Sequence, residues 1–173
     1  PDAVPTLVQV VAGEDEPALR RLAAEALGVA GRDAAVAAPI LVRIIRNPRE
    51  SDELRRRSVI ALGALGDQSA VAAPPLVETL MVDDSQAVRD AAALSLASQG
   101  ARGENILISL LSDGEADVRW RAAQALGSVK PAGERVIAAL VQALDDADER
   151  VKLRAAESLV TLQADAALII PSL

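Results

Sequence analysis

The sequence predicts an all-α fold: a right-handed α-α superhelix, or solenoid, of about five helical hairpins plus a partial sixth helix. Two observations predict it. Of the 173 residues, 51% are hydrophobic, yet the chain has no Phe or Tyr and Trp120 is its single aromatic residue. A core of Ala, Leu, Val and Ile requires close approach of backbones, which helices packed side by side provide. One segment type also recurs along the chain.

The recurring segment has an apolar residue, a basic residue, small apolar residues and then Leu. Its five copies begin at Leu19, Leu54, Val88, Val118 and Val151, which lie 35, 34, 30 and 33 residues apart. A nearly fixed period in this range is the signature of a solenoid. We therefore divide a single domain, residues 1–173, into units at about 1–32, 33–67, 68–102, 103–130 and 131–163.

Residues 165–173 match residues 33–41, so 164–173 would form part of a sixth unit. We expect the chain to be a piece of a longer array. Its C-terminal helix would then lack a partner, and we expect this uncapped helix to allow end-to-end self-association.

Each unit is predicted to contain two helices, and the recurring segment is the second. Its buried positions follow i, i+4, i+7 and i+8, as in Val118, Ala122, Ala125 and Leu126. Acidic residues before it suit a helix N-terminus. The first helix carries a proline, which we expect to bend it. Six glycines are expected to end helices: Gly28, Gly31, Gly63, Gly66, Gly100 and Gly127.

The combination resembles HEAT repeats of an armadillo-type fold, specifically the short bacterial HEAT-like repeats of phycobilisome lyases. The residues that carry the resemblance are the proline of the first helix, an Asp in the turn, and Val-Arg-x-x-Ala-Ala-x-Ala-Leu-Gly at residues 118–127. It covers nearly the whole chain. The resemblance implies that turn acids and second-helix bases of adjacent units form a ladder.

The ladder candidates follow from the spacing of acids and bases. The acid precedes the base by six residues in Asp83/Arg89, Asp113/Arg119 and Asp146/Lys152, and by five in Asp15/Arg20. In the second unit an extra turn residue leaves the partner of Arg55 unassigned. We expect these charge-assisted contacts to fix the rotation of one repeat against the next.

Composition excludes several functions. The chain has no His and no Cys, so a Ser–His–Asp triad, a cysteine nucleophile and the usual zinc sites are excluded. The net charge of −7 argues against binding to nucleic acid or anionic membranes. No apolar run is long enough to span a membrane. We therefore predict a cytoplasmic protein that is not an enzyme and has no cofactor or metal.

One face of the second helix carries unexpected apolar residues. If the first residue of each segment points inward, the residue two further on points about 200° away, to solvent. These positions, and those four residues later, should be polar, but four of the ten are apolar. The candidate partner-binding residues are Trp120, Leu153, Leu94, Ile60, Arg56 and Arg21. Alternatively, Trp120 packs over the neighbouring helix.

The predicted function is a non-catalytic interaction scaffold that binds a protein or peptide on the concave face of the second helices. A second hypothesis, implied by the resemblance, is an accessory or regulatory repeat domain of a larger enzyme, as in bilin lyases. A third is a DNA-lesion-binding HEAT-like domain. The single aromatic residue and the acidic net charge argue against the third.

Overall fold

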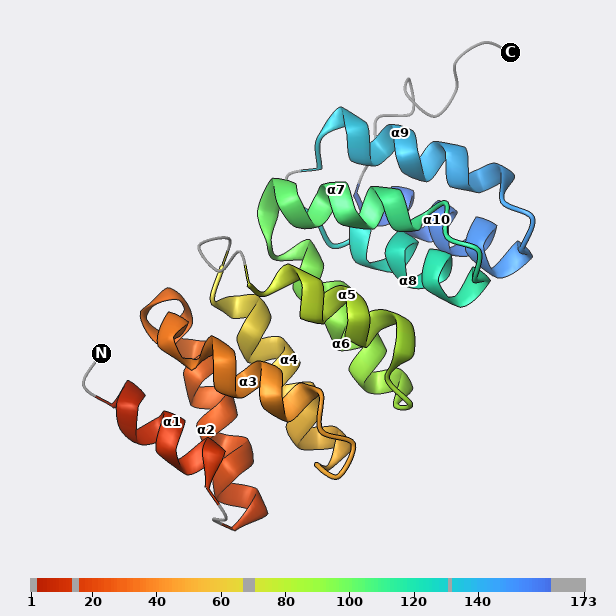
Figure 1. Cartoon of the computed structure of the whole chain (residues 1–173). Coiled ribbons are helices and arrows are strands. Elements are labelled where there is room, and N and C mark those ends of the chain that lie inside the picture. The colour runs from red at the N-terminus through yellow and green to blue at the C-terminus, as the bar shows by residue number, and fades with distance from the viewer. Residues whose placement is uncertain (1–2, 14–15, 67–70, 131, 163–173) are drawn as a thin grey trace. The chain divides into compact units, whose positions relative to one another are not determined.

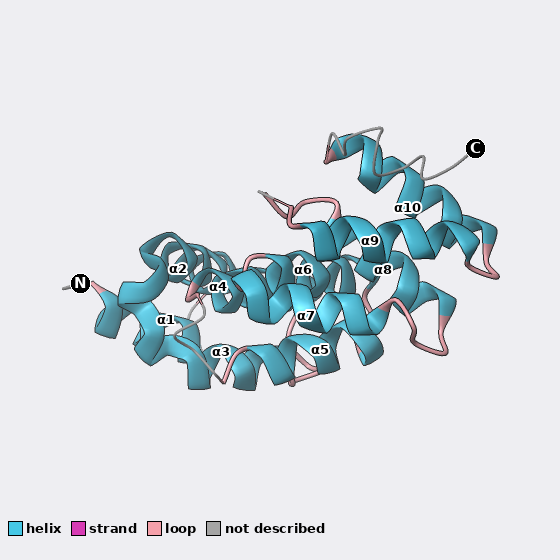
Figure 2. Cartoon of the chain, turned by 90° about the horizontal axis from the view of Figure 1, so that it is seen from above, coloured by secondary structure: helices cyan, strands magenta, loops and turns pink. Residues whose placement is uncertain are grey.

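The computed structural model describes residues 3–13, 16–66, 71–130 and 132–162. These residues form ten α-helices and two short 3-10 helices and contain no strand (Figures 1 and 2). The prediction of an all-α fold is confirmed. The proposed sixth unit at 164–173, with its end-to-end association, and the ladder candidate Asp15 lie outside the described residues.

The chain divides into two compact units, Pro1–Gly100 and Ala101–Leu173. The first unit contains α1 (Val4–Ala12), α2 (Pro17–Ala30), the 3-10 helix η1 (Gly31–Ala37), α3 (Ala38–Ile45), α4 (Asp52–Ala64), α5 (Ala73–Val82) and α6 (Gln86–Ala97). The second contains α7 (Gly100–Leu110) apart from its first residue, α8 (Ala116–Leu126), α9 (Glu134–Gln142), the 3-10 helix η2 (Ala143–Asp145) and α10 (Glu149–Thr161).

Within the first unit, α1 packs on α2, α3 on α4 and α5 on α6 (Figure 1). The second helices form a layer of their own, because α2 packs on α4 and α4 on α6. In the second unit α10 packs on both α8 and α9. Helical pairs stacked through their second helices are therefore the construction principle of each unit.

The buried positions of the second helices follow the predicted spacing. In α8, Val118, Ala122, Ala125 and Leu126 are all buried. The prediction is wrong for the first segment, because Leu19 is 47% exposed on α2. Since most of the buried side chains are Ala, Val, Leu and Ile, neighbouring helices approach closely without large rings between them.

The prolines of the first helices do not bend them. Pro5, Pro39 and Pro74 lie at the first or second position of α1, α3 and α5. At the start of a helix the missing N–H has no partner to lose. The predicted bend is therefore wrong, and the prolines begin these helices instead. Before α3 the chain forms η1, in which Ala34 departs from helical geometry (φ −95°, ψ 16°).

The six glycines have two different roles. Gly31, Gly66 and Gly100 have positive φ and follow helices or begin them, as expected of glycine. In contrast, Gly28 and Gly63 lie within α2 and α4, and Gly127 has φ −63°. For Gly28 and Gly63 the prediction of a helix stop is wrong, whereas Gly127 directly follows Leu126, the last residue of α8, and is its C-cap as predicted. All three allow close approach of the next repeat, since a Cβ at Gly63 would lie 2.6 Å from the Ser95 Cβ.

No helix in the described part of the chain is both long and apolar enough to cross a membrane.

Candidate binding groove between α4 and α6

An arginine near the start of the second helix links neighbouring repeats. In α4, Arg55 Nε and Nη2 donate to the two carboxylate oxygens of Asp83, 3.0 and 3.1 Å away, in the turn of the next repeat. Both side chains are only 7% exposed. The same guanidinium donates to the Glu50 carbonyl of its own turn (2.7 Å). Arg55 therefore links two consecutive turns, the one that precedes α4 and the one that precedes α6.

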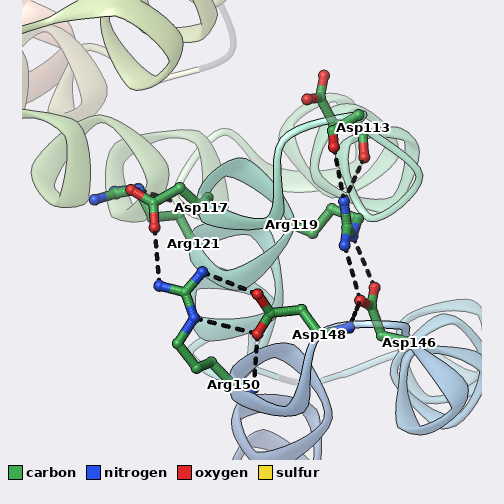
Figure 3. Close-up of polar contacts among 8 residues, drawn as sticks. Asp113, Asp117, Arg119, Arg121, Asp146, Asp148 and Arg150 are labelled. Atoms are coloured by element: carbon green, nitrogen blue, oxygen red, sulfur yellow. Dashed lines mark hydrogen bonds and ion pairs between the residues drawn. The ribbon is translucent and has the colours of Figure 1, made fainter.

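The same arrangement recurs in both units. Arg20 on α2 forms a bidentate pair with Glu50 (2.8 and 2.7 Å) and also donates to the Val11 carbonyl. In the second unit Arg119 forms a bidentate pair with Asp146 (2.8 and 2.9 Å), as Figure 3 shows. Hydrogen bonds from these arginines hold the pKa of the Glu50 and Asp146 carboxyls below their usual values.

In these contacts the acids of the ladder pair with other bases than the six-residue spacing predicts. Arg89 and Arg119 donate to the backbone carbonyls of Asp83 and Asp113, the acids six residues before them. Lys152 donates to Glu149 (2.8 Å), while the Asp146 carboxylate binds Arg119 of the preceding repeat. The predicted pairing of Asp146 with Lys152 is therefore wrong, because Asp146 pairs with Arg119 instead. The Asp113 carboxylate accepts from the Glu115 N–H in its own turn (2.8 Å).

A groove of about 660 Å³ lies between α4 and α6. Its lining falls into three rows in which residues are four apart, so each row runs along one helix face. The row on α4 is Arg56, Ile60 and Ala64; the two rows on α6 are Asp90, Leu94 and Ser98, and Ala87, Ala91 and Ser95. Ala91 and Ser95 are buried, whereas Ile60 and Leu94 are 43% and 46% exposed. The row that contains Ala91 thus forms the floor, and the other two rows form the walls.

Polar contacts hold this floor against α4. Ser95 Oγ donates to the Val59 carbonyl (3.2 Å), and Gln99 Nε2 donates to the Gly63 carbonyl (2.9 Å). Both donors are buried, Ser95 on α6 and Gln99 in the turn that follows it, and both acceptors are backbone atoms of α4. The two walls therefore belong to helices, α4 and α6, that these hydrogen bonds hold in direct contact.

Charged residues lie at the end of the groove where both helices begin. Arg56 donates twice to Glu53, at 3.0 Å for each bond, and Glu53 also accepts from Arg57 Nε (2.8 Å). The two guanidinium groups lower the pKa of Glu53 to about 2. Arg57 extends the network to Glu25 on α2 (3.1 Å).

Three of the six predicted partner-binding residues line this groove: Arg56, Ile60 and Leu94. The others lie elsewhere. Arg21 is half-buried on α2, and Leu153 is exposed on α10. Trp120 is half-buried on α8, where the Arg154 guanidinium lies 4.5 Å from the ring centroid. Trp120 therefore has an intramolecular partner on the neighbouring second helix, and the groove is the stronger candidate site.

Sequence reasoning missed the floor of the groove. At the position three residues after the start of the recurring segment, the second, fourth and fifth units have Arg57, Arg121 and Arg154, but the third has Ala91. The first unit has Leu22 there, so Ala91 is the one small residue at this position, and this was a detectable signal. Among the described residues no group of three or more acidic side chains is arranged to hold a metal ion.

Two protein-family models match parts of this chain. The family model described as HEAT repeats matches residues 104–170, and that of the PBS lyase HEAT-like repeat matches residues 54–80. No curated protein sequence matches the chain.

Three solved structures are similar over most of this chain. The complex of CpcE and CpcF of phycocyanin lyase from Nostoc sp. PCC7120 is 23% identical, with 91% of this chain and 98% of that chain covered and a TM-score of 0.58. A designed armadillo repeat protein in complex with the peptide (KR)4 is 19% identical (93% and 82% covered, TM-score 0.54). An engineered protein is 22% identical (92% and 78% covered, TM-score 0.51). These likenesses concern the fold alone. The matches to the two family models show a HEAT-like repeat protein.

Proposed function

We propose that the protein is a non-catalytic scaffold that binds a segment of a partner protein in the groove between α4 and α6. The carrying observation is the pair of aliphatic walls, Ile60 and Leu94, which stay 43% and 46% exposed on either side of a groove of about 660 Å³. Covering them with another apolar surface is favourable, at roughly 25 cal/mol for each Å² removed from water. Exposed aliphatic residues around a depression are typical of interaction sites.

The character of the lining also supports binding rather than catalysis. Arg56 and Asp90 are the only ionisable side chains that line the groove. Arg56 is bonded to Glu53 and is thus part of the surface network. No nucleophile paired with a base lines the groove, because its two serines donate to backbone carbonyls.

The test uses peptides selected from a displayed random library for binding to the whole chain. Affinities of the selected peptides are then measured for Ile60→Ser, Leu94→Ser and the double variant. The matched control is Val36→Ser, which removes an exposed aliphatic side chain on η1 that does not line the groove. We expect at least a tenfold loss of affinity for the double variant and no loss for the control. Selected peptides that bind the double variant as well as the unchanged chain would contradict the proposal.

An alternative proposal is an accessory domain of a larger enzyme. It is supported by the match of residues 54–80 to the PBS lyase HEAT-like repeat and by the likeness to the phycocyanin lyase complex. Incubation with a bilin separates the two proposals. A scaffold leaves the absorbance spectrum of the free bilin unchanged, whereas a bilin-binding domain shifts and sharpens it.

A further inference from the structure

We infer that the segment bound in this groove is an α-helix whose large aliphatic side chains, four residues apart, lie on the floor of Ala87, Ala91 and Ser95. The inference rests on the function proposed above and names the kind of partner. Three independent features of the groove support it: the spacing of its rows, its shortage of backbone hydrogen-bond partners, and the distribution of side-chain size and charge around it.

The spacing of the rows matches a helix. Each wall and the floor consist of side chains at i, i+4 and i+8 on α4 or α6. Rows of this spacing form the ridges and grooves through which helices pack, and a ridge of one helix fits between two such rows of another. Eight residues at a 1.5 Å rise give a groove of about 12 Å, a little over two helical turns. This length accepts two or three side chains of an incoming ridge.

The groove offers little to an extended peptide. An extended chain needs partners for its own N–H and C=O groups, whereas a helix satisfies them internally. The central lining residues are Ile60, Leu94 and Ala91, which provide no hydrogen bond. The hydroxyls of Ser95 and Ser98 already donate to the carbonyls of Val59 and Ser95 (3.2 and 2.7 Å). The apolar lining therefore favours a segment with no free backbone groups.

The neighbouring repeats show why the groove is open here. At the position of Ala91, α4 has Arg57, which spans to α2 by donating to Glu25 (3.1 Å). At the same position α10 has Arg154, whose guanidinium covers the Trp120 ring of α8 at 4.5 Å. In each case an arginine fills the space between two second helices. Alanine leaves that space free for side chains from another molecule.

Charge sets the orientation of the incoming helix. Arg56 and Asp90 each lie two residues after the start of the recurring segment, at the same level on opposite walls. Arg56 is paired with Glu53 but 34% of its side chain stays exposed, so a helix with an acidic side chain toward α4 and a basic one toward α6 complements both walls at this end. Complementarity of this kind fixes the direction of docking more than it raises affinity.

The experiment analyses the sequences of the selected 16-residue peptides and measures their affinities for variants of the whole chain. Ala91→Arg places in the floor the residue that the second, fourth and fifth units carry at this position, and Ala35→Arg adds the same side chain at an exposed position of η1 as a control. We expect enriched peptides to have large aliphatic residues at i and i+4. Their affinity should fall at least tenfold for Ala91→Arg, stay unchanged for Ala35→Arg, and be lost when a central residue of the peptide becomes proline.

A second floor variant guards against misfolding of the first. Ala87→Leu fills the exposed end of the floor with a good helix former and should weaken the same peptides. Peptides that depend on Ile60 and Leu94 but alternate apolar residues with period two and tolerate a central proline would overturn the helix and leave the scaffold function standing. A library that yields no peptide dependent on Ile60 and Leu94 overturns both.

Discussion

Gly63 on α4 lies against Ser95 on α6 so closely that a Cβ added to the glycine would be 2.6 Å from the serine Cβ. The second unit repeats this contact, because a Cβ on Gly127 would lie 2.6 Å from Ser158 Oγ. In both places the serine hydroxyl donates to a carbonyl one turn before the glycine, Val59 in one case and Ala123 in the other. A glycine in one repeat and a serine in the next therefore form one interlocking contact, which allows the two repeats to approach closely.

From this contact we predict that Gly63→Ala destabilises the protein. Alanine in a helix interior is intrinsically better than glycine by about 0.5–1 kcal/mol. The new methyl group would however overlap the Ser95 Cβ and push α6 away, and overpacking of this kind costs about 1–3 kcal/mol. We expect a net loss of about 1–2 kcal/mol in the free energy of unfolding, measured by urea denaturation.

The matched control for this prediction is Gly114→Ala. A Cβ at Gly114 would meet no atom within 4 Å, and its φ is not positive. We expect its free energy of unfolding to equal that of the unchanged protein within about 0.5 kcal/mol. Equal destabilisation by both substitutions would show that the contact with Ser95 is not the cause.

The repeat and the helical spacing were predictable because they depend on local periodicity. Val118, Ala122, Ala125 and Leu126 are buried at the predicted interval, and the corresponding residues of α4, α6 and α10 are buried as well. The roles of single residues were less predictable, because they depend on the neighbouring repeat. Gly63 has the sequence context of a helix end, yet its role comes from Ser95, 32 residues later.

The ladder and the groove also depend on contacts between repeats, which spacing within one repeat does not reveal. The spacing between an acid and a base within one repeat could not reveal that Arg55 contacts Asp83, 28 residues later. Ile60 and Leu94 were found because they break a polar pattern on an exposed face. The floor was missed because Ala91 is an ordinary residue in a helix, and only the arginines at the same position in other repeats make it informative.

We predict a large loss of stability for Arg55→Met. Its guanidinium and the Asp83 carboxylate are each 7% exposed, so removing the arginine leaves a buried carboxylate without its cation. Breaking one side of such a pair costs about 3–5 kcal/mol. The control is Arg46→Met, because the Arg46–Glu78 pair is 55% and 49% exposed and should contribute at most about 1 kcal/mol. Urea denaturation of both variants measures the difference, and similar midpoints would contradict the prediction.

We also predict an acid-dependent contribution from Glu53. Hydrogen bonds from Arg56 and Arg57 lower its pKa from 4.5 to about 2 in the folded protein. A group with a depressed pKa stabilises the fold above its unfolded pKa, and this stabilisation is lost as the pH falls from about 4.5 toward 2. Because 41% of the Glu53 side chain is exposed, solvent screens the pairs and we expect at most about 1 kcal/mol.

The measurement is the free energy of unfolding of Glu53→Gln and of the unchanged protein across this range of pH. The stability difference between the unchanged protein and the variant should be present at pH 6 and shrink as the pH approaches 2. An NMR titration of the Glu53 carboxyl gives the pKa directly. A midpoint near 4.5 would show that the arginine contacts do not persist in solution.

The last prediction concerns Trp120, whose fluorescence can be followed without interference because it is the only aromatic residue. The Arg154 guanidinium covers the ring at 4.5 Å and also pairs with Glu157 (2.9 Å). Arg154→Ala should expose the ring to water, shift its emission to longer wavelength and cost about 0.5–2 kcal/mol, the range of a partly desolvated cation–π contact. Arg135→Ala removes an exposed arginine on α9 and should change neither quantity. An unshifted emission for Arg154→Ala would mean that other side chains cover the ring. A shift combined with new affinity for aliphatic helical peptides would show that this arginine alone keeps a second groove closed between α8 and α10.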